Sequence, residues 1–220
     1  MKCAVIVFPG SNCDYDAYYV IKNHLNIQVD FVWHKDSDLQ SYDLIIIPGG
    51  FSYGDYLRAG AIARFSKIMH SIKDEAQKGK AIIGICNGFQ ILVESGLLPG
   101  ALITNKSTNF ISKSVDLTVV NNTSLFTNSF SEQQIIRMPI AHKQGNYFAA
   151  DDLIKQLEDN NQIAFKYVNN PNGSKLDIAG IFNDKKNILG MMPHPERASE
   201  LLLGSDEGLD IFKSIISELI

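Results

Sequence analysis

A cysteine stands at the corner of the stretch KAIIGICNGFQILVESG, where an apolar run gives way to the pattern of a short helix. Glycines lie two positions before and two positions after it, at Gly84 and Gly88 around Cys86. Glycine suits such a corner because a Cβ would clash where a strand and the following helix pass closely. The helix N-terminus should bring its positive dipole near the sulfur, and the N–H of Asn87 should face a developing oxyanion. The pattern favours a nucleophile over the alternative, a small buried cysteine that ends a core strand.

A cysteine nucleophile requires a base and a group that orients the base, and the segment GMMPHPERAS offers both. Pro195 disfavours the helical region for His194, so we expect this histidine in extended backbone. Residues i and i+2 of an extended segment point the same way, which puts Glu196 on the side of His194. We therefore predict a triad of Cys86, His194 and Glu196. The alternative is a proline-stiffened loop that carries a surface histidine–glutamate pair.

The chain also contains a G-x-S-x-G pattern, at Gly50, Ser52 and Gly54, which makes a serine nucleophile a rival hypothesis. Its setting is poorer, because Pro48 and two glycines separate the preceding strand from the serine and no helix pattern follows directly. The loop leaves the end of a predicted parallel strand, where α/β sheets place their active sites. We interpret it as an oxyanion loop in which Gly50 or Phe51 supplies a second backbone N–H. The alternative is a flexible turn without a ligand.

The elements that must position these residues alternate between strand-like and helix-like patterns in the first half of the chain. Four β-branched runs cover 3–8, 27–33, 43–48 and 80–86, and helix-like stretches cover about 14–25, 58–79 and 87–95. This alternation is typical of parallel strands joined by right-handed crossovers in an α/β fold. The runs at 43–48 and 80–86 are apolar nearly throughout, which indicates strands covered on both faces.

The second half has a different pattern. Further strand-like runs lie at 114–121, 135–142, 162–168, 178–183 and 187–194, with helix patterns at about 151–159 and 206–219. Loops rich in Asn, Gly and Ser separate these runs, so we expect an antiparallel extension of a largely parallel central sheet flanked by helices. No repeat or linker divides the sequence, and we expect residues 1–220 to form a single domain.

Composition argues against several classes of protein. Of the 220 residues, 45% are hydrophobic and 20% are charged, which suits a globular chain with a substantial core. A net charge of −4 predicts no nucleic-acid surface, and no apolar run is long enough to span a membrane. The N-terminus shows no leader pattern, and neither a Cys-x-x-Cys pair nor a histidine-rich helix predicts a metal site.

Three widely spaced cysteines, Cys3, Cys13 and Cys86, favour a reducing cytoplasm over a disulfide framework. Cys3 lies inside the first predicted strand, and Cys13 lies in a loop with no base near it in sequence. We therefore expect Cys86 alone to react as a nucleophile.

Four segments together resemble the triad, or class I, glutamine amidotransferases: GICNGFQ, PGGFSYGDYLRAGAIA, FPGSNCDYDA and MMPHPERAS. The cysteine corner by itself indicates only the superfamily. The segments GGFSYGDYLRAGA and PHPER are similar to the glutaminase subunits of phosphoribosylformylglycinamidine synthase, an enzyme of de novo purine synthesis. The resemblance runs from Phe8 to the C-terminal helix and implies a flavodoxin-like class I amidotransferase domain over 1–220.

The resemblance implies roles for individual residues. The family's triad falls on Cys86, His194 and Glu196, and its glutamine-holding residue falls on Gln90. This position is one helical turn after the nucleophile and on the same face. The family also places the segment IAHKQGNY near the substrate, which implies glutamine binding by His142, although Lys-Gln here follows the histidine where the family has Gly-Glu.

The implied reaction begins with attack of Cys86 on the side-chain carboxamide of L-glutamine. Ammonia leaves, and water hydrolyses the thioester to glutamate. A larger synthetase subunit would use ATP, Mg and this ammonia to convert formylglycinamide ribonucleotide to formylglycinamidine ribonucleotide. A small bridging subunit is typical where the glutaminase is a separate chain.

No cofactor is expected on this chain, which lacks a P-loop. Two other hypotheses stay open. One is a stand-alone cysteine or serine hydrolase on a similar fold, and the other is a non-catalytic binding subunit that keeps only the fold.

Overall fold

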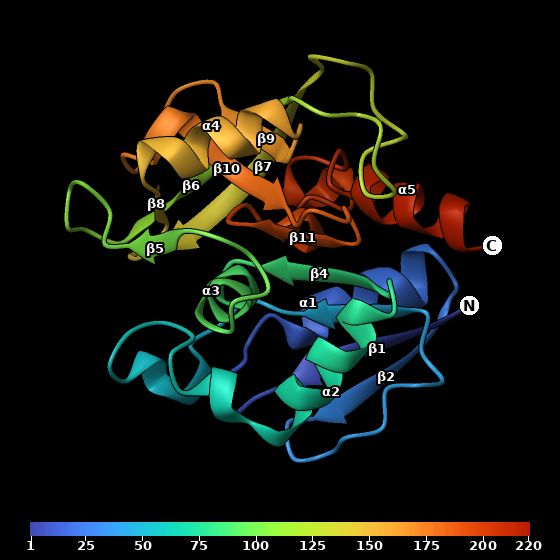
Figure 1. Cartoon of the computed structure of the whole chain (residues 1–220). Helices are drawn as coiled ribbons and strands as arrows, with labels where there is room; N and C mark the ends of the chain where they lie inside the picture. Colours follow the sequence, from blue (N-terminus) through green and yellow to red (C-terminus); the bar gives the residue numbers. More distant parts are fainter.

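A nine-stranded sheet runs through the whole molecule (Figure 1). The computed structural model describes all residues from 1 to 220, and its strand order is β2-β1-β3-β4-β11-β10-β9-β6-β7. The first five strands in this order are parallel: β2 (Gln28–Trp33), β1 (Lys2–Val7), β3 (Leu44–Ile47), β4 (Ala81–Ile85) and β11 (Ile188–Met191). The remaining four pair antiparallel: β10 (Ile178–Phe182), β9 (Ile163–Tyr167), β6 (Ile111–Val119) and β7 (Ile135–His142). The predicted α/β class with an antiparallel extension is confirmed.

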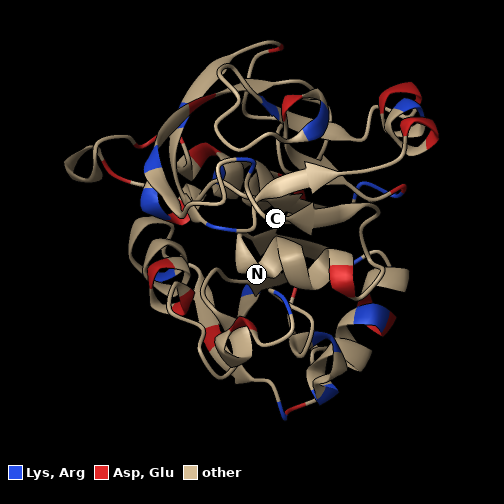
Figure 2. Ribbon diagram, turned by 90° about the vertical axis from the view of Figure 1, so that its left-hand side faces the viewer, with Lys and Arg blue, Asp and Glu red and all other residues tan.

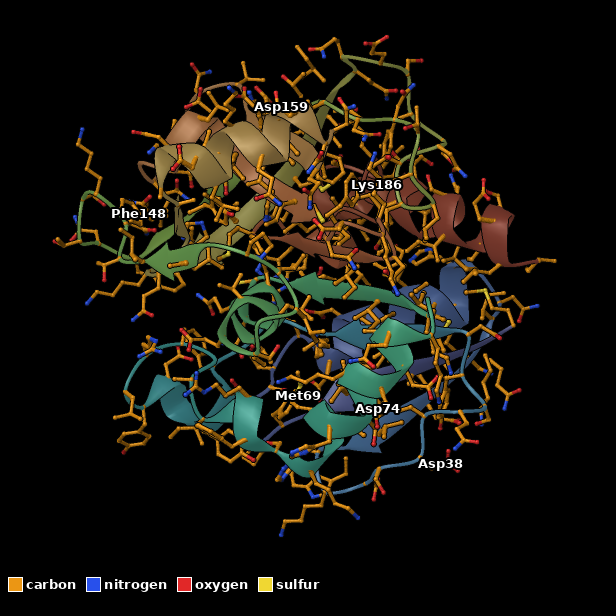
Figure 3. The ribbon with its side chains drawn as sticks, in the orientation of Figure 1. Asp38, Met69, Asp74, Phe148, Asp159 and Lys186 are labelled. Carbon is orange, nitrogen blue, oxygen red and sulfur yellow. The ribbon has the colours of Figure 1, made fainter.

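Helices cover the sheet where the sequence alternates between strand and helix patterns. They are α1 (Asp14–Tyr19), continued by a π-helical segment (Val20–His24), then α2 (Lys67–Gln77), α3 (Asn87–Glu94), α4 (Asp151–Asp159) and α5 (Leu209–Leu219). Helix α2 is amphipathic, with Met69 buried in the core and Asp74 in solvent, and Figure 3 labels both residues. Helix α3 packs on β3, β4 and β11, the strands that are apolar nearly throughout because both of their faces are covered.

The expected direction of one strand was wrong. The run at 187–194 was assigned to the antiparallel extension, but β11 pairs in parallel with β4, and Ile188 lies opposite Ile82. The turn between β10 and β11 reverses the chain, so β11 returns in the direction of the parallel strands. The parallel half therefore ends with a strand that comes from the far end of the sequence.

The predicted helix over 58–79 was too long at its start. Residues before Ser66 form an irregular segment with a single 3-10 turn, Ala63–Phe65, and α2 begins at Lys67. Gly60 has a φ of +79°, and a Cβ there would lie 2.8 Å from the backbone nitrogen of Ile91. The segment packs directly on α3, so a tertiary contact overrides its helical periodicity.

A two-stranded sheet outside the main sheet was not expected from the sequence. It pairs β5 (Ala101–Ile103) with β8 (Asn146–Phe148), and Figure 3 shows Phe148 at the outer edge of the molecule. Basic and acidic residues, coloured blue and red on the ribbon of Figure 2, are interspersed along the outer helices and loops, in keeping with the small net charge. None of the helices combines the length and the apolar character that a membrane crossing requires.

Candidate active site

The candidate site lies at the carboxyl ends of three neighbouring parallel strands. The glycine pair Gly49 and Gly50 follows β3, Cys86 follows β4, and His194 comes three residues after Met191, the last residue of β11. Because these strands are adjacent and parallel, their ends meet at one edge of the sheet. Segments about 150 residues apart in sequence are thereby brought together.

Cys86 occupies a strained turn between β4 and α3. Its backbone has φ +50° and ψ −103°, a conformation that few non-glycine residues adopt, and it is the N-cap of α3. A Cβ on Gly84 would approach the backbone of Gly88 within 2.8 Å, and a Cβ on Gly88 would overlap the carbonyl oxygen of Ile47. The structure confirms that both glycines allow the close passage of helix and strand that holds the cysteine outward.

Two backbone N–H groups near Cys86 are free to bind an oxyanion. Asn87 is the first residue of α3, so its N–H has no intrahelical partner, and the N–H of Gly50 also makes no hydrogen bond. The N–H of Phe51 instead donates to the carbonyl of Gly10 at 2.9 Å. Of the two expected loop donors, Phe51 is therefore committed elsewhere in this structure, and Gly50 remains available.

His194 and Glu196 form a buried, hydrogen-bonded pair. Nδ1 of His194 donates to Oε1 of Glu196 at 2.6 Å, and the two residues are only 1% and 2% exposed. His194 is extended, as predicted, but Pro195–Arg197 form a 3-10 turn. Burial alone would lower the pKa of His194, whereas the Glu196 carboxylate and the thiols of Cys86 and Cys13 together raise it well above its ordinary value. This environment favours transfer of the Cys86 proton to His194, which leaves a thiolate beside an imidazolium.

The thiol of Cys86 is not yet hydrogen-bonded to its expected base. Its Sγ lies 3.7 Å from the carbonyl oxygen of Ala141, and Nε2 of His194 makes no hydrogen bond although it is buried. Catalytic contacts are often loose without substrate and tighten on binding. The free Nε2 is the nitrogen that can accept a proton, because Nδ1 is held by Glu196.

A hollow of about 240 Å³ opens beside Cys86, and we call it the Cys86 hollow. Asp55 and Lys143 both line it, so one acidic and one basic side chain face the same small space. Burial raises the pKa of Asp55 to about 6. The hollow therefore offers a partner for each charge of an amino-acid zwitterion.

Gln90 connects α3 to the segment that follows β7, on the other side of the Cys86 hollow. Its Nε2 donates to the carbonyl of Gln144 at 2.6 Å, and its Oε1 accepts from Nδ2 of Asn87 at 2.9 Å. The side chain of Gln144 in turn accepts from the N–H of Ala59 at 3.1 Å. The predicted glutamine-holding residue thus lines the hollow and also fixes its walls.

His142 lines the same hollow and has a defined tautomer. Oδ1 of Asn105 faces its Nδ1 at 3.1 Å, while Nδ2 of Asn105 donates to the carbonyls of His142 and Asn109. Since Oδ1 can only accept, Nδ1 carries the proton and Nε2 is an unpartnered acceptor. Burial, with a smaller effect of His194, lowers the pKa of His142 to about 4, so this ring is neutral at ordinary pH.

The rival serine lacks a base. Ser52 is buried, its Oγ makes no hydrogen bond, and it does not line the Cys86 hollow. Its backbone N–H donates to Oδ1 of Asn87 at 3.0 Å, which ties the loop to the start of α3. These contacts support the interpretation of this segment as a positioning loop.

Sequence reasoning missed Cys13 and Arg197, which lie beside the histidine–glutamate pair. Nη2 of Arg197 donates to Sγ of Cys13 at 3.1 Å, and ligand atoms of Cys13, His194 and Glu196 lie within 4.8 Å of one another. Those three residues could approach a metal ion, but the guanidinium against the sulfur opposes a cation there. Cys13 follows β1, the next parallel strand in the sheet, and this position was the signal available in the sequence.

Because Cys13 lies beside His194 in the structure, the lack of a base near it in sequence no longer explains why Cys86 alone should be labelled. We expect diazo-oxo-norleucine, an electrophile that mimics glutamine, to modify Cys86 and to leave Cys3 and Cys13 intact. Burial raises the pKa of Cys13 despite the nearby His194 and Arg197, and raises that of Cys3 to about 12, whereas Cys86 lines an open hollow. Peptide mass spectrometry after labelling locates the adduct, and an adduct on Ser52 would support the serine-hydrolase hypothesis.

Comparison with solved structures gives close and distant relatives. A chain in the structure of PurLQS from Thermotoga maritima is 48% identical, with a TM-score of 0.92, over 100% of this chain and 99% of that one. A glutamine amidotransferase from Thermotoga maritima is 16% identical with a TM-score of 0.64 over 100% and 97% of the chains. The glutaminase domain of Trypanosoma brucei CTPS with bound acivicin is 14% identical with a TM-score of 0.62 over 99% and 94%. The last two show likeness of fold alone.

The family comparison covers most of the sequence. Residues 1–207 match the CobB/CobQ-like glutamine amidotransferase domain, a stretch that contains Cys86, the glycine loop, His194 and Glu196. The predicted amidotransferase fold and this match agree over the same residues. The chain belongs to the family of CobB/CobQ-like glutamine amidotransferase domains.

Proposed function

We propose that this chain is the glutaminase subunit of a phosphoribosylformylglycinamidine synthase. The observation that carries the proposal is the Cys86 hollow. It combines a nucleophile at a strained turn with one acidic and one basic residue, Asp55 and Lys143, which suit the two charges of an amino-acid substrate. The likeness to a chain of the PurLQS structure over the full length supports this assignment within the amidotransferases.

Glutamine binding follows from the groups that line the hollow. The carboxylate of Asp55 pairs with the substrate α-ammonium, and Lys143 pairs with the α-carboxylate. The unpartnered Nε2 of His142 accepts a hydrogen bond from the substrate, because its other nitrogen is held by Asn105. The side-chain carboxamide then extends toward Cys86.

The chemistry uses the residues at the three strand ends. The Cys86 sulfur attacks the carboxamide carbon, and the N–H groups of Asn87 and Gly50 stabilise the oxyanion. Nε2 of His194 receives the thiol proton and transfers it to the leaving nitrogen, which departs as ammonia. Glu196 holds the imidazolium through Nδ1, and water hydrolyses the thioester to glutamate.

The proposal includes partners for the ammonia. A large synthetase subunit consumes ammonia, ATP and Mg to form formylglycinamidine ribonucleotide, and a small bridging subunit joins the two; this chain binds no cofactor of its own. We also place the complex in the cytoplasm, which suits the three unpaired cysteines of this chain.

Replacement of each histidine separates their roles. We expect His194→Ala to lower kcat for glutamine roughly 10³-fold or more, because triad members act as a unit. We expect His142→Ala to raise KM more than it lowers kcat, because His142 contacts substrate only. Steady-state glutamate release measures both effects, and equal loss of kcat in the two variants would contradict the assignment of His194 as base.

Asp55 should make glutamine binding depend on pH. A carboxyl with a pKa of about 6 is protonated at lower pH and then cannot pair with an ammonium, so affinity should fall up to about tenfold per unit below pH 6. Calorimetric titration of glutamine into the Cys86→Ala variant between pH 5 and 8 isolates binding from turnover. In the same background, Asp55→Asn should bind weakly at every pH. A pH dependence that persists after this substitution would exclude Asp55 as the ammonium partner.

The partner should activate the glutaminase. We expect the isolated chain to hydrolyse glutamine slowly, and the synthetase subunit to raise the rate at least about tenfold. The loop glycines allow the peptide plane of Gly50 to turn, and a partner that fixes the loop would hold the Gly50 N–H toward the oxyanion. One oxyanion donor is worth roughly 10²–10³ in kcat. Glutamate release with and without synthetase, ATP and formylglycinamide ribonucleotide measures the effect, and full activity of the chain alone would favour a stand-alone hydrolase.

A further inference from the structure

A second and larger hollow lies against the catalytic carboxylate, and we call it the Arg197 hollow. Its volume is about 510 Å³, and none of its lining residues lines the Cys86 hollow. Glu196 and Arg197 line it together with Asp16 and Tyr15 from α1 and Glu200 and Leu203 from the C-terminal region. The triad thus has a hollow on each of two sides, and only one of them holds the nucleophile.

Exposed apolar side chains border the Arg197 hollow. Leu201–Leu203 form a 3-10 turn whose first two leucines are 75% and 92% exposed, and Tyr15 is 64% exposed. The turn is held in place by hydrogen bonds from Leu203 to Glu200 and from Gly204 to Leu201. Large apolar side chains displayed on an ordered turn are typical of protein–protein contact sites.

The apolar surface continues from the hollow toward the edge of the sheet. Tyr15 stacks near Tyr18 with ring centroids 6.3 Å apart, and Tyr18 stacks on Phe31 of the edge strand β2 at 4.6 Å. Phe31 is itself exposed. Among the other exposed aromatic residues that line a hollow, Phe51 and Phe110 belong to the Cys86 hollow, and Phe65 belongs to a third hollow.

The residues that line the Arg197 hollow carry a net negative charge, which favours binding of a positively charged group. Three acidic residues, Asp16, Glu196 and Glu200, line it together with a single basic residue, Arg197. Arg197 already pairs with Asp16 at 3.0 Å, and Oε2 of Glu196 is buried without any hydrogen-bond partner. The partly exposed carboxylate of Glu200 is therefore the acidic group that a cation from outside the chain can reach.

We propose that the Arg197 hollow and the leucine turn are a docking surface for the synthetase subunit, which presents a lysine or arginine flanked by apolar side chains. This inference rests on the proposed function. A second copy of this chain fits poorly, because a two-fold contact places the same acidic hollow against itself.

Docking here would act on the base through the segment that carries it. Glu196 orients His194, and a partner held against Arg197 and Glu200 would fix the segment that contains Glu196. Arg197 also contacts the sulfur of Cys13, whose backbone N–H donates to the carbonyl of Gly49 at 3.3 Å. The surface is thereby linked to both the base and the oxyanion loop.

The experiment compares four variants for binding to the purified synthetase subunit by surface plasmon resonance. Leu202→Asp removes the most exposed leucine, and Ile135→Asp is its control at the opposite edge of the sheet. Glu200→Lys reverses a charge of the hollow, and Glu132→Lys reverses an exposed charge elsewhere. We expect Leu202→Asp and Glu200→Lys to weaken binding at least about tenfold, with both controls close to the original chain.

Activity without the partner distinguishes a docking defect from misfolding. Leu202→Asp should keep the basal glutaminase rate and lose stimulation by the synthetase. If the original chain does not bind synthetase at all, the proposed partnership fails. If it binds and both test variants bind equally well, or Ile135→Asp is as damaging as Leu202→Asp, the docking surface is wrong. A dimer of this chain that Leu202→Asp disrupts would assign the surface to a second copy and overturn the proposal.

Discussion

The close passage of α3 over the end of β3 is the constraint on which the site depends. No side chain fits at Gly88 because the carbonyl oxygen of Ile47 occupies that space. This contact fixes the start of α3, which in turn holds Cys86 at a positive φ and leaves the N–H of Asn87 unpaired. The same contact sets the glycine loop beside the helix, where Asn87 accepts a hydrogen bond from Ser52. Nucleophile and oxyanion donors are therefore positioned by backbone packing more than by side-chain contacts.

The buried His194–Glu196 pair is the second organising feature, and its surroundings explain why it tolerates burial. An isolated buried charge is costly, but here a carboxylate faces an imidazole at 2.6 Å and a guanidinium lies in the next residue. The His194–Glu196 pair leaves two of its polar atoms without a hydrogen bond, namely Nε2 of His194 and Oε2 of Glu196. The first is available for the thiol proton.

Two hollows on different sides of one base give a physical basis for coupling. Substrate enters beside Cys86, whereas the proposed synthetase contact lies against Glu196. A partner that orders the carboxylate and a substrate that draws the thiol toward His194 would each favour the same catalytic arrangement, so each would favour the binding of the other. Such an arrangement would limit wasteful release of ammonia from the free subunit.

The sequence by itself determined the local chemistry. Glycines at −2 and +2 around Cys86, prolines around His194 and apolar runs over 43–48 and 80–86 act through sterics within a few residues, so they were sufficient to predict the turn, the extended histidine and the central strands. The resemblance of a few motifs then indicated the amidotransferase family.

Only the tertiary structure decided what distant segments do together. The parallel direction of β11, the unwound segment before α2, the place of Cys13 and Arg197 beside the base, and the access of Asp55 to the Cys86 hollow all depend on contacts between loops far apart in sequence. No local pattern encodes such contacts, because each loop is irregular by itself and acquires its geometry from the strand ends that meet at the sheet edge.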